Sequence, residues 1–391
     1  MAETSKTKIR MGMIGGGSGA FIGAVHRMAA SIDNEIELVC GAFSSSAEKS
    51  IASGRALMLP EQRCYPDFQT MVDAESKLPA DQRMQFVAIV TPNHMHFPAA
   101  KAALEAGFHV LSDKPATLNL TEVKTLKKIV EQTGLLYGLT HTYTGYPMVK
   151  EAQTLVANGE FGPIRKVIVE YIQGWLSEAQ ASDNKQADWR TDPARSGISG
   201  CMGDIGSHAA NLVEYVTGKE ITHVCAELTA FVEGRRLDDD GIVLLKMQDG
   251  IKGTLQASQI AAGEENNLTI RVYGEKGGLE WRQQEPNTLT LKYLDKPMQV
   301  LRTGGMHSAR TTANTRTPMG HPEGYLEAFA NIYVSFAQAV RDFTNGDYDA
   351  TKDYDFPDVH EGVRGMALVE SFVNSSNQDT KWYNLEQLLA D

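Results

Sequence analysis

The stretch IRMGMIGGGSGA, residues 9–20, places a glycine-rich turn directly after a short apolar run. Gly15, Gly17 and Ala20 match the pattern G-x-G-x-x-G/A, and residues 21–32 continue with apolar side chains at helical spacing. Glycines permit a tight turn and a close approach of the backbone to a pyrophosphate, whose charge is met by the N–H groups at a helix start. The alternative is an ordinary glycine-rich turn. We predict a strand, turn and helix that bind a dinucleotide through Gly15, Gly17, Ser18 and Ala20.

The pattern of apolar runs divides the 391-residue chain into two parts. In residues 8–142, short runs rich in β-branched residues alternate with helical patterns, which is typical of βαβ units around a parallel sheet. The strands predicted there are 9–14, 36–43, 86–90, 109–111 and 135–139, and the helices are 21–32, 98–106 and 120–133. We therefore predict an α/β fold whose first domain, residues 1–145, is a Rossmann dinucleotide-binding domain.

Residues 146–391 show longer predicted strands that are joined by turns. A helix predicted at 147–157 precedes strands at 164–173, 221–231, 241–247, 251–258, 268–273 and 289–294, and helices at 325–345 and 363–374 follow. The pair Asp249-Gly250 between two of these strands is typical of a tight hairpin turn. This pattern predicts a second domain of the α+β class with a mostly antiparallel sheet.

The composition is that of a folded protein without a polyanionic partner. Hydrophobic residues make up 42% of the chain and charged residues 22%, and the net charge is −12. Nucleic-acid binders carry basic faces that replace counterions, so we expect no nucleic-acid partner. The four cysteines are scattered without a C-x-x-C pair, which argues against a metal site or a disulfide scaffold. Residues 1–6 hold no apolar signal core and no apolar run reaches membrane-spanning length, so we expect a cytoplasmic protein without membrane contact.

The end of the second predicted strand bears on the choice between NAD and NADP. A carboxylate at this position binds the ribose hydroxyls of NAD, whereas this chain has AFSSS at residues 42–46. Serine hydroxyls with Lys49 nearby tolerate a 2′-phosphate, and the alternative is a solvated serine turn before a helix. We predict NAD or NADP as the cofactor and favour NADP, with Ser44, Ser45 and Lys49 near the ribose.

The segment TPNHMH, residues 91–96, follows the third predicted strand. It therefore lies at the carboxyl edge, where open α/β sheets bind their ligands. We expect Thr91, Asn93 and His96 to contact the cofactor at its ribose or nicotinamide. The alternative is a metal pair of His94 and His96, but no nearby acid or cysteine completes such a site.

Three separated residues are the candidate catalytic groups. Lys114 lies in SDKP, residues 112–115, after another predicted strand, and with Asp113 it joins the predicted cofactor-binding residues. Asp204 and His208 are four residues apart at the start of a predicted helix, so both project from one face. A histidine accepts the proton of a secondary alcohol near neutral pH, and an ammonium group stabilises the developing alkoxide. The alternatives are a surface lysine, an Asp N-cap and an ordinary helix histidine.

With these residues placed, the chain resembles the glucose-fructose oxidoreductase, inositol dehydrogenase and MocA (Gfo/Idh/MocA) family. The resemblance runs through the glycine-rich turn, TPN with His96, the Lys-Pro loop, GEFGPI at residues 159–164 and GDIGSH at residues 203–208. It implies that the lysine of an E-K-P loop, an aspartate and a following histidine carry catalysis, matched here by Lys114, Asp204 and His208. It also implies that residues 146–391 form an open-sheet domain for substrate binding and oligomerisation, in a homodimer or homotetramer.

This chain departs from the family pattern at two places. Asp113 stands where the family usually has Glu, and TYT at residues 142–144 stands where many members have Asn-Tyr-Arg. Family substrates are mostly sugars, inositols and related polyols, so the resemblance implies a small-molecule carbohydrate or polyol substrate. Two long irregular stretches, residues 174–203 and 295–324, are candidate walls of its pocket. The predicted substrate-binding residues are Lys114, Tyr143, Trp175, Trp189, Arg190, Asp204, His208 and His321.

Three functions fit this combination of motifs. The first is an NAD(P)-dependent dehydrogenase or reductase that transfers hydride between nicotinamide and a secondary alcohol or ketone of a sugar, inositol or related polyol. The second is a glycosidase that holds NAD and cleaves by transient oxidation and elimination. The third is a cofactor-sensing regulator, which would not need Asp204 and His208 at this spacing. The first is our hypothesis.

Overall fold

The computed structural model describes residues 7–178 and 185–390. The chain divides into two compact units, one formed by Met1–Thr140 with Phe329–Gly362 and the other by His141–Ala328 with Val363–Asp391. The first unit thus includes residues 329–362, which the predicted domain boundary at residue 145 assigns to the second domain. The domain boundary itself stays a prediction. None of the helices in the described ranges is long and apolar enough to cross a membrane.

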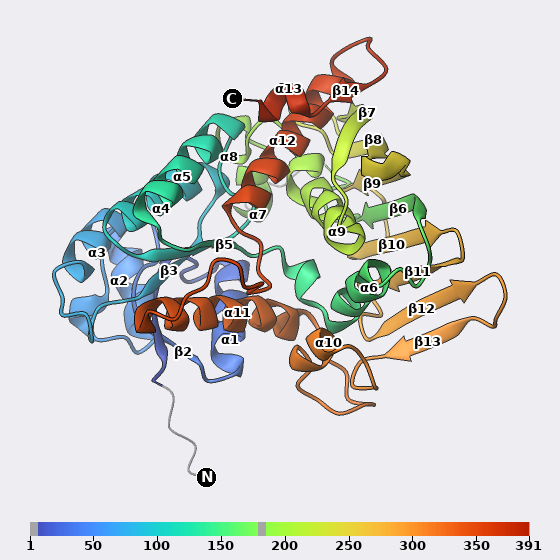
Figure 1. The fold of residues 1–391 in the computed structure, drawn as a ribbon. Helices are drawn as coiled ribbons and strands as arrows, with labels where there is room; N and C mark the ends of the chain where they lie inside the picture. Colours follow the sequence, from blue (N-terminus) through green and yellow to red (C-terminus); the bar gives the residue numbers. More distant parts are fainter. Residues whose placement is uncertain (1–6, 179–184, 391) are drawn as a thin grey trace. The chain divides into compact units, whose positions relative to one another are not determined.

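The first unit is built on a five-stranded parallel sheet (Figure 1). Its strands are β1 (Ile9–Gly15), β2 (Ile36–Ala42), β3 (Phe86–Val90), β4 (His109–Ser112) and β5 (Tyr137–Leu139). Its helices include α1 (Phe21–Ile32), α2 (Ala47–Ala56), α3 (Phe68–Glu75), α4 (His96–Glu105) and α5 (Leu120–Thr133). The strand order is β2-β1-β3-β4-β5, so the order reverses between β1 and β3. Open α/β sheets bind ligands at such a reversal, outside the carboxyl ends of the strands.

The long helix α11 (Tyr325–Asn345) contributes residues 329–345 to this unit. Phe336 is fully buried, and its ring packs edge-on against Phe86 of β3 with 5.4 Å between the centroids. A Cβ atom at Gly138 of β5 would lie 2.9 Å from the Phe336 ring, so the glycine permits this close approach. Arg341 also forms an ion pair with Glu35, the residue before β2. This packing explains why a C-terminal segment belongs to the N-terminal unit.

The second unit is built on a nine-stranded sheet in the order β13-β12-β11-β10-β6-β9-β8-β7-β14. Its strands are β6 (Ile164–Ile172), β7 (Ile221–Thr229), β8 (Asp240–Met247), β9 (Lys252–Ser258), β10 (Asn267–Gly274), β11 (Gly277–Arg282), β12 (Thr288–Tyr293), β13 (Gln299–Arg302) and β14 (Tyr383–Asn384). Only β6 and β9 pair in parallel, and the remaining pairs of this sheet are antiparallel. The predicted combination of a Rossmann sheet with a mostly antiparallel second sheet is confirmed.

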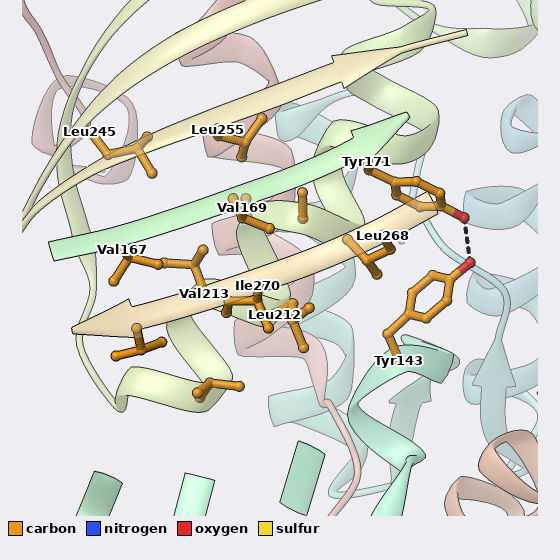
Figure 2. Packing of buried hydrophobic residues seen from close by; sticks show 14 of the residues in the cluster. Tyr143, Val167, Val169, Tyr171, Leu212, Val213, Leu245, Leu255, Leu268 and Ile270 are labelled. Atoms are coloured by element: carbon orange, nitrogen blue, oxygen red, sulfur yellow. Dashed lines mark hydrogen bonds between the residues drawn. The ribbon is translucent and has the colours of Figure 1, made fainter. Parts of the chain in front are cut away.

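One face of the nine-stranded sheet carries the core of this unit. Alternate residues of β6, Val167, Val169 and Tyr171, are buried and face the helix α9 (Ser207–Thr217), whose Leu212 and Val213 pack against them (Figure 2). The helix α6 (Pro147–Ala157) contributes further buried side chains to the same cluster. The period-2 alternation of buried residues is the pattern of a sheet with one buried face. On the strand β8, Ile242 and Leu244 are 48% and 42% exposed.

Most of the predicted elements are present, with boundaries that shift by a few residues. α4 begins at His96, two residues before its predicted start, and α12 (Val359–Ser376) begins four residues before its predicted start. Asp249 and Gly250 both have positive φ, 55° and 79°, which is the backbone of the predicted hairpin turn. The stretches predicted as irregular contain α7 (Lys185–Arg190), α8 (Pro193–Ser196), β13 and α10 (Ala309–Ala313).

Among the elements of the two sheets and their flanks, α2, α3, β11, β13 and β14 were not predicted. The buried residues of α2 are Ser50, Ser53 and Gly54, so it lacks the stripe of large apolar residues that marks a helix in a sequence. α3 is only 8 residues long. β11 opens with two glycines, which are depleted in strands.

The turn between β1 and α1 depends on one very close backbone contact. Gly16 has a φ of +69°, and a Cβ atom placed on Gly23 of α1 would lie 2.3 Å from the Cα of Gly16. No side chain fits in this space. The sequence therefore carries glycine at both positions, and α1 begins directly against the end of β1.

We predict that Gly23→Ala destabilises the protein by about 2 kcal/mol or more, because a methyl group must force the turn and the helix apart. Chemical denaturation of the purified variant measures this. The matched control is Gly365→Ala in α12, where a Cβ atom meets nothing within 4 Å. That variant keeps or gains stability, by up to about 1 kcal/mol, because alanine is the better helix former. Equal stability of Gly23→Ala and the wild type would contradict the close contact.

Candidate active site

The glycine-rich turn has a shape that only glycine permits at its key positions. Gly15 has a φ of +83°, and a Cβ there would lie 2.8 Å from the side chain of Thr91. The N–H of Gly17 donates to the carbonyl of Phe43 at 3.2 Å, and a Cβ on Gly17 would lie 2.7 Å from that carbonyl oxygen. The N–H of Ser18 donates to Ser53 Oγ at 3.1 Å. The turn is therefore held against the segment that follows β2.

The helix α1 begins at the outer end of this turn. Ala20 is its N-cap, and within the described part of the chain no side chain caps the helix. Gly19 has a φ of +81°, and a Cβ there would meet nothing within 4 Å. An open glycine turn at an uncapped helix start is the arrangement that binds a pyrophosphate. Gly15, Gly17, Ser18 and Ala20 thus fit a dinucleotide.

The segment after β2 forms a serine turn. Ser44 Oγ accepts from the N–H of Ser46, and Ser46 Oγ caps α2 by accepting from the N–H of Lys49. Ser45 and Lys49 are exposed. Residues 42–46 contain no carboxylate. This geometry leaves hydroxyls and an ammonium group at the position where a ribose acid would stand.

His96 connects two loops at the carboxyl edge of the sheet. Its Nδ1 lies 2.6 Å from the carbonyl oxygen of Pro115, its Nε2 lies 2.8 Å from that of Thr91, and the side chain is buried. Main-chain carbonyls thus lie against both ring nitrogens, and His96 joins the two loops. Its contact with the cofactor stays a prediction. Asn93 is buried beside it in the same segment, at the end of β3.

Asp113 holds the backbone of Lys114 in place. Asp113 Oδ1 accepts from the N–H of Lys114 at 2.9 Å and from Thr140 Oγ1 at 3.0 Å. The N–H of Asp113 donates to the carbonyl of Ile89 in β3 at 2.8 Å, and the peptide bond between Lys114 and Pro115 is cis. Lys114 is half-buried. The loop that carries the lysine is therefore fixed to the sheet on both sides.

Asp204 lies in a π-helical turn, Met202–Gly206, that runs directly into α9. Asp238 caps this turn, because its Oδ1 accepts from the N–H of Gly200 and its Oδ2 from that of Met202, each at 2.8 Å. Ser199 Oγ accepts from the N–H of Gly203 at 2.9 Å. Asp204 is therefore not the N-cap that the alternative interpretation supposed. π-helical turns occur frequently at functional sites.

The carboxylate of Asp204 is held by two donors. Arg190 Nε donates to Asp204 Oδ2 at 3.2 Å, and Gln259 Nε2 donates to the same oxygen at 3.0 Å. The guanidinium of Arg190 also stacks on aromatic rings, with its Cζ 4.3 Å from the ring centroid of Trp189 and 5.9 Å from that of Trp175. The structure thus gathers four predicted substrate-binding residues, Asp204, Arg190, Trp175 and Trp189, into one cluster.

The ring of His208 lies among three other rings. Its centroid is 4.9 Å from that of Tyr143, 5.5 Å from that of His141 and 6.3 Å from that of Tyr171. The hydroxyls of Tyr143 and Tyr171 are hydrogen-bonded to each other (Figure 2), and Tyr171 donates to Asn266 Oδ1 at 2.8 Å. Burial raises the pKa of both tyrosines, so they remain neutral phenols. His208 is therefore fixed by packing against a hydrogen-bonded aromatic cluster.

Several residues of these clusters were missed by sequence reasoning. Gln259 follows directly after β9, Tyr171 lies near the end of β6, and Asn266 precedes β10. Only their places at strand ends could have indicated a role. His321, which was predicted to bind substrate, is exposed and lies 3.3 Å from the Pro318 carbonyl within its own loop. Its role stays a prediction.

Comparison with known proteins places these features in a family. Residues 9–141 match the model of an oxidoreductase family with an NAD-binding Rossmann fold, and residues 149–280 match that of the GFO/IDH/MocA C-terminal domain. The chain is 33% identical over 380 residues, 96% of each chain, to the uncharacterised oxidoreductase YfiI of Bacillus subtilis.

Solved structures agree with this assignment. An inositol dehydrogenase homologue from Azotobacter vinelandii in complex with NAD⁺ is 35% identical, with a TM-score of 0.93 over 97% of both chains. A complex of an inositol dehydrogenase homologue from the same organism with NADH and myo-inositol is 33% identical, with a TM-score of 0.89 over 97% of this chain and 98% of that one. The matches span the chain and not the dinucleotide-binding part alone. The chain therefore belongs to the Gfo/Idh/MocA family and is an oxidoreductase with an NAD-binding Rossmann domain.

Proposed function

We propose that this protein is an NAD(P)-dependent dehydrogenase or reductase that acts on a secondary alcohol or ketone of a sugar, inositol or related polyol. The observation that carries the proposal is the surroundings of Asp204 and His208. Asp238 and not Asp204 caps the turn, Arg190 binds the Asp204 carboxylate, and the ring of Tyr143 packs against His208. The similar protein that was solved with NADH and myo-inositol supports the same substrate class. The relatives reported above give no support to glycoside cleavage by transient oxidation.

The three catalytic groups divide the work of the reaction. His208 accepts the hydroxyl proton on a ring nitrogen when the alcohol is oxidised and returns it when a ketone is reduced. The ammonium of Lys114 stabilises the negative charge that develops on the substrate oxygen. Asp204 accepts a hydrogen bond from a substrate hydroxyl while Arg190 and Gln259 hold its carboxylate. When bound, the nicotinamide ring supplies the carbon that accepts the hydride.

Substrate recognition falls to the residues around Asp204. The rings of Trp175 and Trp189 offer apolar faces on which a sugar ring stacks, and Trp175 is 41% exposed. Arg190 adds hydrogen-bond donors between these rings. Tyr143 and His321 complete the proposed set. We also propose a homodimer or homotetramer, which the exposed Ile242 and Leu244 on the open sheet support.

The end of β2 supports NADP over NAD. Ser44, Ser45 and Lys49 offer hydroxyls and a positive charge, and residues 42–46 contain no carboxylate that would repel a 2′-phosphate. The relatives solved with NAD⁺ and NADH favour the opposite preference. The preference between NADP and NAD therefore needs a direct binding measurement with both dinucleotides.

We predict that Lys114→Ala and His208→Ala each lower kcat/KM by about 100-fold or more, because each removes a group that acts on the reacting oxygen. Absorbance of the reduced nicotinamide across a panel of polyols measures this. Lys219→Ala and His223→Ala, the same changes outside the clusters, serve as controls with unchanged turnover. Wild-type rates in both site variants would refute the assigned roles.

We predict that NADP binds more tightly than NAD and that Lys49→Glu lowers the affinity for NADP by about tenfold while sparing NAD, because the new carboxylate repels the 2′-phosphate. Fluorescence titration with both dinucleotides measures this. Lys77→Glu, the same change at an exposed position after α3, is the control. Comparable or tighter binding of NAD to the wild type would show that the serine turn does not select NADP.

A further inference from the structure

His26 lies in the middle of α1 and is completely buried in the first unit. Its ring packs against Phe329 with 4.9 Å between the centroids and edge-on against Tyr333 at 5.8 Å. Its Nδ1 lies 2.8 Å from the Tyr333 hydroxyl, and its Nε2 lies 3.9 Å from Asp113 Oδ2. The ring thus stands between a tyrosine of α11 and the carboxylate that precedes Lys114.

The two neighbours determine which ring nitrogen carries the proton. Burial raises the pKa of Tyr333, so its hydroxyl stays protonated and can donate to Nδ1. A neutral imidazole has one donor and one acceptor nitrogen. If Nδ1 accepts from Tyr333, then Nε2 carries the hydrogen and directs it toward the negative Asp113 Oδ2. The opposite tautomer would direct a lone pair at the carboxylate.

The protein also keeps His26 neutral. The pKa of His26 is lowered to about 4, mainly by burial and also by the charges of Arg27 and His96, while the negative charge of Asp113 opposes them. His26 therefore takes up its second proton only as the pH falls toward 4. The range from pH 5.5 to 8.5 lies above this pKa, so we expect the ring to stay neutral there. It then acts as a fixed dipole and does not change its charge with pH.

The proximity of His26 to Asp113 Oδ2 matters because the other oxygen, Oδ1, holds the backbone of Lys114. Asp113 Oδ1 accepts from the N–H of Lys114 and from Thr140 Oγ1, as described above. His26 Nε2 lies 3.9 Å from Asp113 Oδ2, which is too far for a hydrogen bond, so the ring acts on the carboxylate only as a nearby dipole. We expect this attraction to favour the orientation in which Oδ1 holds the Lys114 backbone.

We propose that His26 is a positioning residue for Lys114, in which a Tyr333, His26 and Asp113 chain orients the carboxylate that fixes the lysine loop. The expected kinetic effect rests on the proposed function. The geometry rests only on contacts within the first unit. It also links α1, which begins at the dinucleotide turn, to the loop that carries Lys114.

The kinetic test uses two amide substitutions of His26 that differ in reach. His26→Gln places its amide nitrogen near the position of ring Nε2, and His26→Asn near that of Nδ1. We expect His26→Gln to keep kcat within about threefold of the wild type, whereas His26→Asn loses about tenfold or more in kcat with little change in KM for the dinucleotide. A merely structural role would lower stability without changing kcat per folded molecule. A wild-type kcat per folded molecule in His26→Asn, or equal losses of kcat in the two variants, would therefore overturn the proposal.

His109 supplies the matched control. It is also buried in the first unit, burial lowers its pKa to about 4, and its ring packs edge-on against Phe343. Its Nδ1 accepts from the N–H of Leu136 and not from the Asp113 network. His109→Asn is expected to lower thermal stability and to leave kcat per folded molecule unchanged. A loss of kcat equal to that of His26→Asn would show that any buried histidine gives this effect.

A spectroscopic test of the full chain does not depend on turnover. In protein labelled with ¹⁵N-histidine, the signal that is lost in His26→Gln identifies His26. We expect a neutral ring protonated at Nε2 from pH 5.5 to 8.5, and a shift of that Nε2 signal in Asp113→Asn. A ring protonated at Nδ1, or an Nε2 signal that ignores Asp113→Asn, would contradict the chain of contacts. If no polyol is turned over, the proposed function fails while this test still decides the role of His26.

Discussion

The contact of Gly16 with Gly23 is the constraint on which the first unit depends. Because no Cβ separates the two backbones, α1 begins directly against the end of β1, at the point where the strand order reverses. This approach fixes the position of the open turn at Gly19 and of the uncapped helix start. It also fixes the direction of α1 and thereby brings His26 to Asp113, one residue before Lys114. Cofactor binding and the lysine loop therefore depend on the same two glycines.

In the second unit, Asp238 has the corresponding role. It satisfies the backbone N–H groups of Gly200 and Met202 at the start of the π-helical turn, which would otherwise lack these partners. Asp204 is then available to the side chains of Arg190 and Gln259. One carboxylate thus caps the turn, while the other is held by side chains.

Much of the fold could be predicted because its signals are local. The helix 120–133 was predicted with its observed ends, since Asn119 caps its start and Gly134 ends it with a φ of +65°. Buried β-branched runs likewise identified β1, β3 and β4. α2 escaped prediction because its buried face consists of serines and a glycine, which carry no hydrophobic pattern.

The residues of the candidate site likewise fall into two groups, those that a local motif indicates and those that only long-range contacts place. Gly15, Lys114, Asp204 and His208 could be proposed because each lies in a short motif with a chemical meaning. Gln259 and Asn266 could not, because their roles arise from contacts across many residues of chain. His26 is the extreme case, since its partner Tyr333 is 307 residues away and only the folded structure brings them together. His96 was proposed from its motif, but its contacts with the carbonyls of Thr91 and Pro115, which join two loops, are visible only in the folded structure.

We propose that an ammonium, a carboxylate and an imidazole from distant parts of the sequence act on one substrate carbon. The most direct measurement is a crystal structure of the protein with reduced nicotinamide dinucleotide and a polyol that it turns over. We expect Lys114 Nζ, the Asp204 carboxylate and a ring nitrogen of His208 all to hydrogen-bond to the substrate at or beside the carbon that faces nicotinamide C4. A complex in which other groups surround that carbon, with these three side chains remote from it, would refute the proposed roles.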